Sequence, residues 1–201
     1  HMTLNLARLK NDGKLTSDSQ RFILKWKNKD LTTVAITPAL PKTPTIPPLP
    51  ACKPTDFTSE EKPAATCPSG FAIRGIKCSG KYCDNISLNC CPYWYTEDRQ
   101  AQIRWSDWFS EEASRNSVTT NSGFVSALEC RGSYCDSMRL SILTTPRLRN
   151  AGQCTFIPQV SEESGPTAGQ CPSGDFAAGM RCTGEYCDNV SLYCCKYEIV
   201  R

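Results

Sequence analysis

The chain has 201 residues, a formal net charge of +3 and fourteen cysteines. This charge is too small over such a length to indicate a nucleic-acid partner or an anionic membrane surface, and no apolar run approaches the roughly 20 residues that span a bilayer. No Cys-x-x-Cys pair occurs, and the single histidine belongs to an opening His1-Met2 pair typical of an expression tag. Disulfides in a secreted, periplasmic or cell-surface protein are therefore favoured over zinc ligands.

Residues 1–36 combine this tag remnant with a basic segment. Residues 3–36 contain no cysteine and carry seven Lys or Arg against three Asp. Residues 21–27 place Phe22, Leu24 and Trp26 on one face of an extended segment, which predicts a strand. Because the segment is too short to form its own core, it either docks on another part or is the tail of an upstream domain.

Residues 37–50 form the predicted domain boundary. Six of these fourteen residues are proline. Proline fixes φ and lacks an amide proton, so this composition favours an extended polyproline II linker, with a proline-rich recognition site as the alternative. We expect a separate domain over residues 52–201.

One eight-residue pattern, Cys-x-Gly-x-Tyr-Cys-Asp followed by Asn or Ser, occurs three times in this domain. Its copies begin at Cys78, Cys130 and Cys182, in steps of 52 residues, and a Ser-Glu-Glu segment precedes each copy. A fixed period of this length predicts three repeats, over 52–100, 101–151 and 152–201. Alternating apolar residues on both sides of each pattern predict two strands joined by the Cys-to-Cys loop. The predicted fold is all-β with pseudo-threefold symmetry, as a β-prism or alternatively a β-trefoil.

The cysteines divide six, two and six among the repeats. Four residues replace cysteines together in the middle repeat: Ile103, Thr120, Ile142 and Leu143. Loss in an even number fits disulfides, and the pattern cysteines are expected to pair as Cys78–Cys83, Cys130–Cys135 and Cys182–Cys187. Spacing leaves the remaining connectivity open. We favour Cys67–Cys90 with Cys52–Cys91, and Cys171–Cys194 with Cys154–Cys195.

Several short motifs resemble a known family. Cys-Pro-Ser-Gly at 67–70, the strand that follows it and Asp-Asn-Ile-Ser-Leu-Asn-Cys at 84–90 are similar to the repeat of the vitelline membrane outer layer protein family. The Trp-containing segment at 105–108 resembles the one ahead of that family's Cys-Pro-x-Gly. The resemblance implies a β-prism of three Greek-key sheets. The six-residue Cys-to-Cys loop and the double cysteines depart from the family, so no site in the loop is carried across.

The residue types contain no evident catalytic set. Only the tag supplies a histidine that could act as base, and the cysteines are expected in disulfides. Adjacent glutamates of Ser-Glu-Glu point to opposite faces of a strand, so they are interpreted as solvated turns or strand-edge charges, not as a glycosidase pair. The repeated Asp-Asn pairs offer ligands for calcium or sugar, but their repetition favours a structural role in the turn. We predict no enzymatic activity, no metal site and no cofactor.

Aromatic residues concentrate where the first repeat meets the second, with six in residues 93–109. Stacking on sugar rings or entry into a membrane interface competes with a role in the core of the repeat that lost two disulfides. The tyrosine of each loop either packs on its disulfide or forms an exposed platform. The candidate ligand-binding residues are Trp94, Tyr95, Trp105, Trp108, Tyr82, Tyr134 and Tyr186.

These observations favour a non-catalytic, secreted recognition module that is attached to a larger toxin, adhesin or exoenzyme. Its expected partner is a glycan or glycoprotein on a cell surface or matrix, and no nucleic acid. One alternative is a structural or protein-interaction domain of an extracellular protein, which includes docking on the parent protein's other domains. The other is a membrane-targeting domain of a pore-forming protein, which keeps membrane association open.

Overall fold

The computed structural model describes residues 25–26, 29–30 and 48–200. Residues 1–47 and 48–201 belong to two compact units. In the first unit, β1 (Lys25–Trp26) pairs antiparallel with β2 (Lys29–Asp30). Most of the strand predicted over 21–27, and the linker up to residue 47, lie outside the described residues. None of the helices in the described part of the chain is long and apolar enough to cross a membrane.

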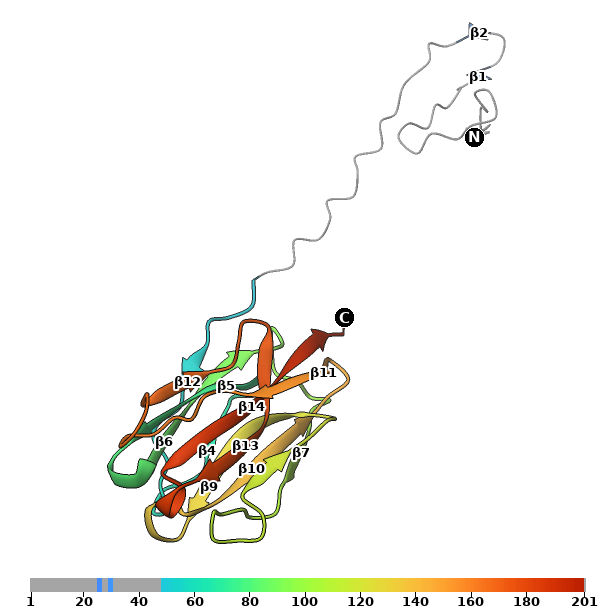
Figure 1. Ribbon diagram of the computed structural model, residues 1–201. Helices are drawn as coiled ribbons and strands as arrows, with labels where there is room; N and C mark the ends of the chain where they lie inside the picture. Colours follow the sequence, from blue (N-terminus) through green and yellow to red (C-terminus); the bar gives the residue numbers. More distant parts are fainter. Residues whose placement is uncertain (1–24, 27–28, 31–47, 201) are drawn as a thin grey trace. The chain divides into compact units, whose positions relative to one another are not determined.

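The second unit is built from three four-stranded antiparallel sheets (Figure 1), so the all-β prediction is confirmed. The first sheet contains, in order, β12 (Ala168–Gln170), β5 (Phe71–Ser79), β6 (Asn85–Pro92) and β3 (Lys53–Pro54). The second contains β4 (Ala65–Thr66), β9 (Phe124–Arg131), β10 (Ser137–Thr144) and β7 (Gln102–Trp105). The third contains β11 (Leu148–Phe156), β14 (Asn189–Ile199), β13 (Asp175–Thr183) and β8 (Ser117–Thr119).

Each sheet receives one of its outer strands from another repeat. The central hairpin and one outer strand come from the same repeat, whereas the second outer strand comes from the preceding one. Thus β4 pairs with β9, β8 pairs with β13, and β12 of the last repeat pairs with β5 of the first. This cyclic exchange joins the three sheets into one unit. The choice between a prism and a trefoil stays a prediction.

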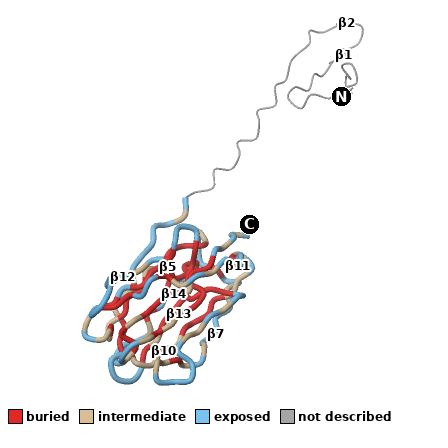
Figure 2. The backbone as a smooth tube through the Cα atoms, viewed as in Figure 1, coloured by how far each residue is buried: buried red, intermediate tan, exposed pale blue. Residues whose placement is uncertain are grey.

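The inner faces of the three hairpins form the main core. Strands β5, β9 and β13 contact one another, and Ile76, Leu128 and Met180 on them are at most 2% exposed. The buried segments follow these hairpin strands (Figure 2). β5 contains a β-bulge, where the register shifts between Ile73 and Gly75. The apolar alternation therefore predicted the buried face correctly.

The Ser-Glu-Glu segments themselves form turns, and the outer strands of the three sheets lie on both sides of them along the chain. An isolated bridge precedes each segment, namely Thr58–Ile86, Phe109–Met138 and Val160–Val190. Directly afterwards the chain turns, as where the Lys62 amide donates to the Ser59 carbonyl at 3.1 Å. The glutamates are mostly exposed there, so their interpretation as solvated turn residues agrees with the structure.

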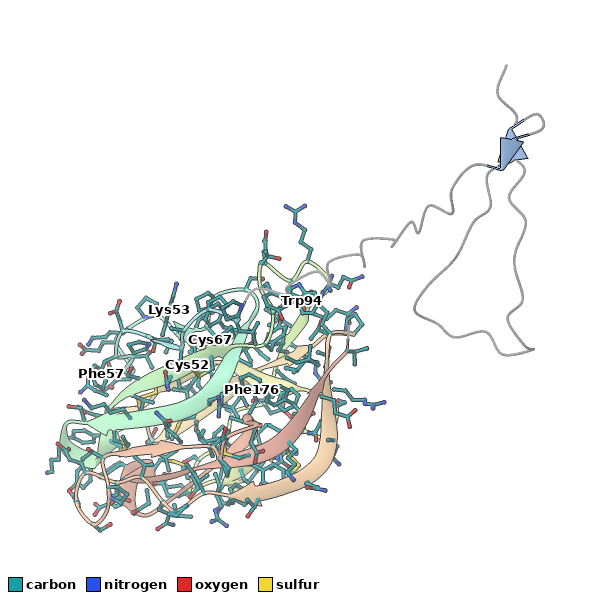
Figure 3. All side chains as sticks on the ribbon, turned by 90° about the horizontal axis from the view of Figure 1, so that it is seen from above. Cys52, Lys53, Phe57, Cys67, Trp94 and Phe176 are labelled. Atoms are coloured by element: carbon teal, nitrogen blue, oxygen red, sulfur yellow. A yellow bond between two sulfur atoms is a disulfide. The ribbon has the colours of Figure 1, made fainter. Side chains whose placement is uncertain are left out.

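Seven disulfides join all fourteen cysteines in the pairs favoured from the repeats. Figure 3 draws them as yellow bonds and labels Cys52 and Cys67 of the first repeat. In the third sheet Cys154 lies opposite Cys195. In the second sheet Ile103 lies opposite Leu143 at the corresponding place. The middle repeat thus has an apolar pair where the third has a disulfide.

Candidate functional site

The seven predicted aromatic residues lie in three separate places. Tyr82, Tyr134 and Tyr186 meet where the three hairpin turns contact one another. Trp105 and Trp108 share contacts with one arginine of the second sheet, Arg139. Trp94 and Tyr95 follow β6, which begins at the first turn and runs away from it over eight residues, so they lie at the opposite end. Residues 93–109 therefore do not form one aromatic surface.

The turns occupy residues 78–83, 130–135 and 182–187, and we call them the disulfide turns. Each contains a short 3-10 segment: η1 (Lys81–Cys83), η2 (Ser133–Cys135) or η3 (Glu185–Cys187). In the first, Tyr82 and Cys83 have φ of 59° and 56°, and the Asp84 amide donates to the Lys81 carbonyl at 3.2 Å. Two left-handed central residues are the geometry of a type I′ hairpin turn, which normally takes Asn-Gly.

The glycine and aspartate of the pattern have structural roles in these turns. Gly80 has φ of 79°, and a Cβ on it would clash with the Asp84 carboxylate. Asn85 donates through Nδ2 to Asp84 Oδ1 at 2.6 Å. Because the carboxylate sits against the glycine and is held by its neighbour, the structural interpretation of the Asp-Asn pairs is supported.

The three disulfide turns interlock at one end of the domain. The tyrosine ring centroids lie 5.1–5.3 Å apart in edge or tilted arrangements. A sulfur of each turn lies 3.2 Å from a carbonyl oxygen of another turn, as for Cys83 Sγ and Asp188 O. Tyr134 is 37% exposed. The rings therefore pack on one another and form a partly open aromatic surface, while packing of each ring on its own disulfide stays a prediction.

Carboxylates surround this end. Burial raises the pKa of Asp136, and the nearby Glu111 and Glu112 raise it further. Glu111 also lies close to Cys182 and Cys187 in a grouping that resembles a metal-ligand set. Both sulfurs belong to one disulfide and so cannot supply the thiolate that a metal requires. This group is therefore not a metal site.

Substitution at Tyr134 tests the left-handed turn. We expect the Tyr134→Gly variant to be more stable than Tyr134→Ala by about 1 kcal/mol, because only glycine adopts positive φ without cost. Both variants lose the same ring contacts, and urea denaturation measures the difference. At Lys77, an exposed residue of β5, the same two substitutions should give the opposite order. Equal stability of the two Tyr134 variants would contradict the turn geometry.

Two tryptophans and two arginines alternate on the second sheet, and we call them the Trp–Arg stack. The Arg139 guanidinium lies 4.8 Å from the ring centroids of both Trp105 and Trp108. Arg131 lies 4.0 Å from the Trp108 ring. Glu129, opposite Arg139 on β9, forms an ion pair with it at 2.6 Å. The order is therefore Trp105, Arg139, Trp108, Arg131, and an ion pair anchors its central arginine.

The Trp–Arg stack is specific to the second sheet. Strand register makes Pro54, Trp105 and Phe156 equivalent, because they lie opposite Asn89, Ser141 and Tyr193. The position of Arg139 is occupied by Ser87 in the first sheet and by Ser191 in the third, as the hairpin registers show. The third sheet has a smaller counterpart, in which the Arg181 guanidinium lies 4.4 Å from the Phe156 ring centroid. The middle repeat thus differs from it in having two indoles and two arginines in one stack.

A groove lies beside the Trp–Arg stack, lined by residues of β7 and β8. Its volume is about 590 Å³, within the range of small-ligand sites. Trp105 is 37% exposed and contributes to its lining. The remaining lining residues are mostly polar: Arg104, Ser106, Asp107, Arg115, Ser117, Val118, Thr119, Thr120 and Ile142. Arg115 and Asp107 form an exposed ion pair at 3.4 Å. The groove therefore joins one aromatic wall to hydroxyl groups and charges.

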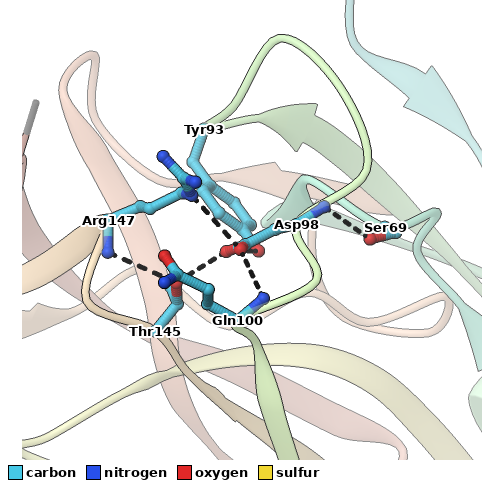
Figure 4. A network of polar contacts seen from close by, with 6 residues as sticks. All are labelled: Ser69, Tyr93, Asp98, Gln100, Thr145 and Arg147. Carbon is cyan, nitrogen blue, oxygen red and sulfur yellow. Dashed lines mark hydrogen bonds and ion pairs between the residues drawn. The ribbon is translucent and has the colours of Figure 1, made fainter.

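The end opposite the disulfide turns holds a buried polar network around Asp98 (Figure 4). Thr145 donates to Asp98 Oδ2 at 2.6 Å and the Tyr93 hydroxyl donates to it at 3.1 Å. Arg147 Nε lies 3.3 Å from Asp98 Oδ1, and its guanidinium lies 4.0 Å from the Trp94 ring. Burial acts to raise the pKa of Asp98, but these hydrogen bonds and the Arg147 charge outweigh it and lower the pKa. Trp94 is therefore part of an anchored loop.

Tyr93 and Phe109, which frame the aromatic segment, belong to the core and are at most 1% exposed.

Comparisons with protein-family models, with curated proteins and with solved structures find no match for this chain. The resemblance to vitelline membrane outer layer proteins therefore stays a prediction, and the site must be judged on its own geometry.

Sequence reasoning identified Trp105 and Trp108 but missed Arg131, Arg139 and the residues of β8. One signal was present in the sequence. Alignment of the repeats places Arg139 where the other two have serine, and a cation next to an aromatic pair favours cation–π contact. No comparable signal marks β8, because its position beside β7 depends on strand exchange.

Proposed function

We propose that residues 48–200 form a non-catalytic, secreted recognition module that binds a glycan or glycoprotein through the groove between β7 and β8. The observation that carries this proposal is the partly exposed indole of Trp105, held against Arg139 in the wall of a polar groove. Seven disulfides fit an extracellular protein.

The groove offers the two kinds of contact that a sugar ring requires. An indole presents a rigid apolar face to the C–H groups of a sugar, while serine and threonine hydroxyls both donate and accept hydrogen bonds. Arg139 contacts Trp105 and is itself held by Glu129. A side chain that is ordered before binding loses less conformational entropy when the ligand arrives. The Trp–Arg stack therefore holds the Trp105 indole in place before the ligand arrives, which favours affinity.

The charges of the groove favour binding over catalysis. Asp107 is the one carboxylate among the residues that line it, whereas glycoside hydrolysis requires two carboxyl groups facing each other. Asp107 is also exposed and paired with Arg115, which does not favour a role as a general acid. We therefore propose recognition without turnover of the ligand.

Loss of Trp105 should remove binding. On a glycan array, the full chain should bind at least one glycan, and Trp105→Ala should lower the affinity for it at least about tenfold, as for an aromatic binding hot spot. Phe156→Ala is the matched control, because Phe156 has the equivalent register position in the third sheet. Absence of binding to every glycan, or equal loss in both variants, would contradict the proposal.

One observation supports a protein partner as the second candidate. β7 is an edge strand of its sheet, and Ile103 on it is 62% exposed. A free edge with an apolar side chain can accept an extended segment of another protein. Pull-down of a defined protein that is insensitive to added sugar and to Trp105→Ala, but is lost in Ile103→Lys, would favour this function over glycan binding.

A further inference from the structure

We propose that the ligand of this groove is an anionic saccharide that carries sulfate or carboxylate groups, an inference that rests on the proposed function. The observation behind it is a group of four arginines around Trp105, whereas Phe156, the equivalent ring of the third sheet, lies against Arg181. Four arginines lie on or beside the groove and the Trp–Arg stack: Arg104, Arg115, Arg131 and Arg139.

The equivalent positions of the other repeats are mostly neutral. Arg131 corresponds to Ser79 and Thr183, which lie opposite Asn85 and Asn189 as Arg131 lies opposite Ser137. Arg139 corresponds to Ser87 and Ser191. Arg104 corresponds to Lys53 and Thr155, by its pairing with Ile142. Arg115 corresponds to Pro166 of the third repeat. The Arg115 carbonyl accepts a hydrogen bond from the Ser110 amide, as the Pro166 carbonyl does from the Ser161 amide. Glu129 in turn corresponds to the cations Lys77 and Arg181, so the sheets differ in where their positive charges lie. The other two sheets form without arginine at the four positions of the middle repeat.

Two of the four guanidinium groups have no carboxylate partner. Arg115 pairs with Asp107 at 3.4 Å, and Arg139 pairs with Glu129 at 2.6 Å. Within residues 48–200, Arg104 and Arg131 form no ion pair. Arg131 lies on the Trp108 ring and donates from Nε to the Ser137 hydroxyl at 3.4 Å, which holds its plane in place. Both groups are exposed and retain donors for a ligand.

Guanidinium chemistry selects the class of ligand. Arginine presents a planar set of N–H donors that matches carboxylate and other oxyanions in a bidentate manner. Trp105 and the hydroxyl groups of Ser117, Thr119 and Thr120 fit a sugar ring, so the two features together indicate an anionic sugar and not a bare phosphate. Arg131 lies in the second disulfide turn and acts against its acidic surroundings, since it lowers the pKa of Asp136 while burial, Glu111 and Glu112 raise it.

Titration of the full chain with matched saccharides tests this inference. The probes are a heparin-derived oligosaccharide, its chemically desulfated form, hyaluronan, which carries carboxylates alone, and a neutral chitooligosaccharide. We expect the sulfated or carboxylated probes to bind at least tenfold more tightly than the neutral one, with affinity falling as salt rises. The double variant Arg104→Gln with Arg131→Gln should weaken binding of the anionic probes at least tenfold more than binding of the neutral probe.

The control is Arg149→Gln with Lys196→Gln, which removes the same charge from exposed positions of the third sheet. Equal loss in this control would overturn the inference by showing attraction to net charge alone. Equal affinity for neutral and anionic probes would overturn it and leave the proposed function standing. Absence of binding to every probe would overturn the inference, and a glycan array without any binding would overturn the proposed function as well. Arginine-dependent binding to phosphatidylserine vesicles without binding to any saccharide would also overturn both.

Discussion

Replacement of Cys154 and Cys195 together by alanine is expected to lower the free energy of unfolding by about 3 kcal/mol, because the Cys171–Cys194 disulfide shortens the loop that this bond closes. This disulfide closes a loop with a sequence separation of 41 residues. In the chain-entropy model a cross-link stabilises mainly by restricting the unfolded chain, so a longer loop gives a larger effect. It also joins β11, an outer strand, to β14 of the central hairpin.

The Cys130–Cys135 disulfide provides the comparison, because its separation is only 5 residues. Alanine at both of its positions should cost about 2 kcal/mol in the same model. Urea denaturation under non-reducing conditions gives the two values, and free-thiol titration verifies that the other six disulfides remain. Equal losses, or a larger loss from the short loop, would show that strain or packing in the folded state dominates.

The reciprocal experiment uses the middle repeat. Ile103 and Leu143 lie opposite each other as Cys154 and Cys195 do, so Ile103→Cys with Leu143→Cys should form an eighth disulfide and stabilise the protein. The outer strands β3 and β11 are adjacent to or contain a disulfide cysteine, whereas β7 has none. Among β3, β7 and β11, the strand without this covalent constraint is therefore β7, which lines the proposed binding groove.

Much of the fold could be predicted because repetition made local signals consistent. The 52-residue step located the hairpins, and the joint loss of four cysteines indicated that these four positions pair among themselves. Alternation of apolar residues predicted the hairpin strands, and Ile73, Ile86 and Leu88 on these strands are fully buried. These properties depend on residues that are close in sequence or identical between repeats.

The remaining features depend on contacts that no local pattern encodes. β4 consists of Ala65 and Thr66 alone, and it is a strand because β9 of the next repeat offers a free edge. The Trp–Arg stack joins Trp105 to Arg139, which lies 34 positions further along the chain. The left-handed conformation of Tyr82 was equally hidden, since a bulky residue at positive φ contradicts local preference and is maintained here by the disulfide and the neighbouring turns.

Substitution of Asp98 by asparagine is expected to have the second large effect, a loss of about 3 kcal/mol in the free energy of unfolding. Asp98 is 4% exposed, and Tyr93, Thr145 and the Gln100 amide donate to its carboxylate. An asparagine amide keeps the shape but removes the charge that faces Arg147, and one of its two polar atoms is a donor facing donors. Asp107→Asn is the control, since this exposed ion pair should contribute well under 1 kcal/mol.

The pH dependence of the free energy of unfolding provides a second test of this prediction. The pKa of Asp98 is lowered from its ordinary value of 3.8, so the folded protein binds fewer protons at this site than the unfolded chain. Its stabilising contribution is therefore complete above that ordinary value and is lost as the pH falls through the lowered pKa. The stability difference between the wild type and Asp98→Asn should be constant near neutral pH and should narrow below about pH 4. A constant difference down to strongly acidic pH would contradict a charged Asp98.

The Asp98→Asn variant also tests whether the loop around Asp98 contributes to ligand binding in the groove. Trp94 lies on Arg147, so near-ultraviolet circular dichroism should change when Arg147 loses its carboxylate partner. The groove is lined by residues of 104–120 and Ile142, none of which contacts Asp98 in the network described above. Glycan affinity of Asp98→Asn should therefore match the wild type at temperatures where both are folded. A loss as large as that of Trp105→Ala would show that the loop around Asp98, and not the groove alone, takes part in binding.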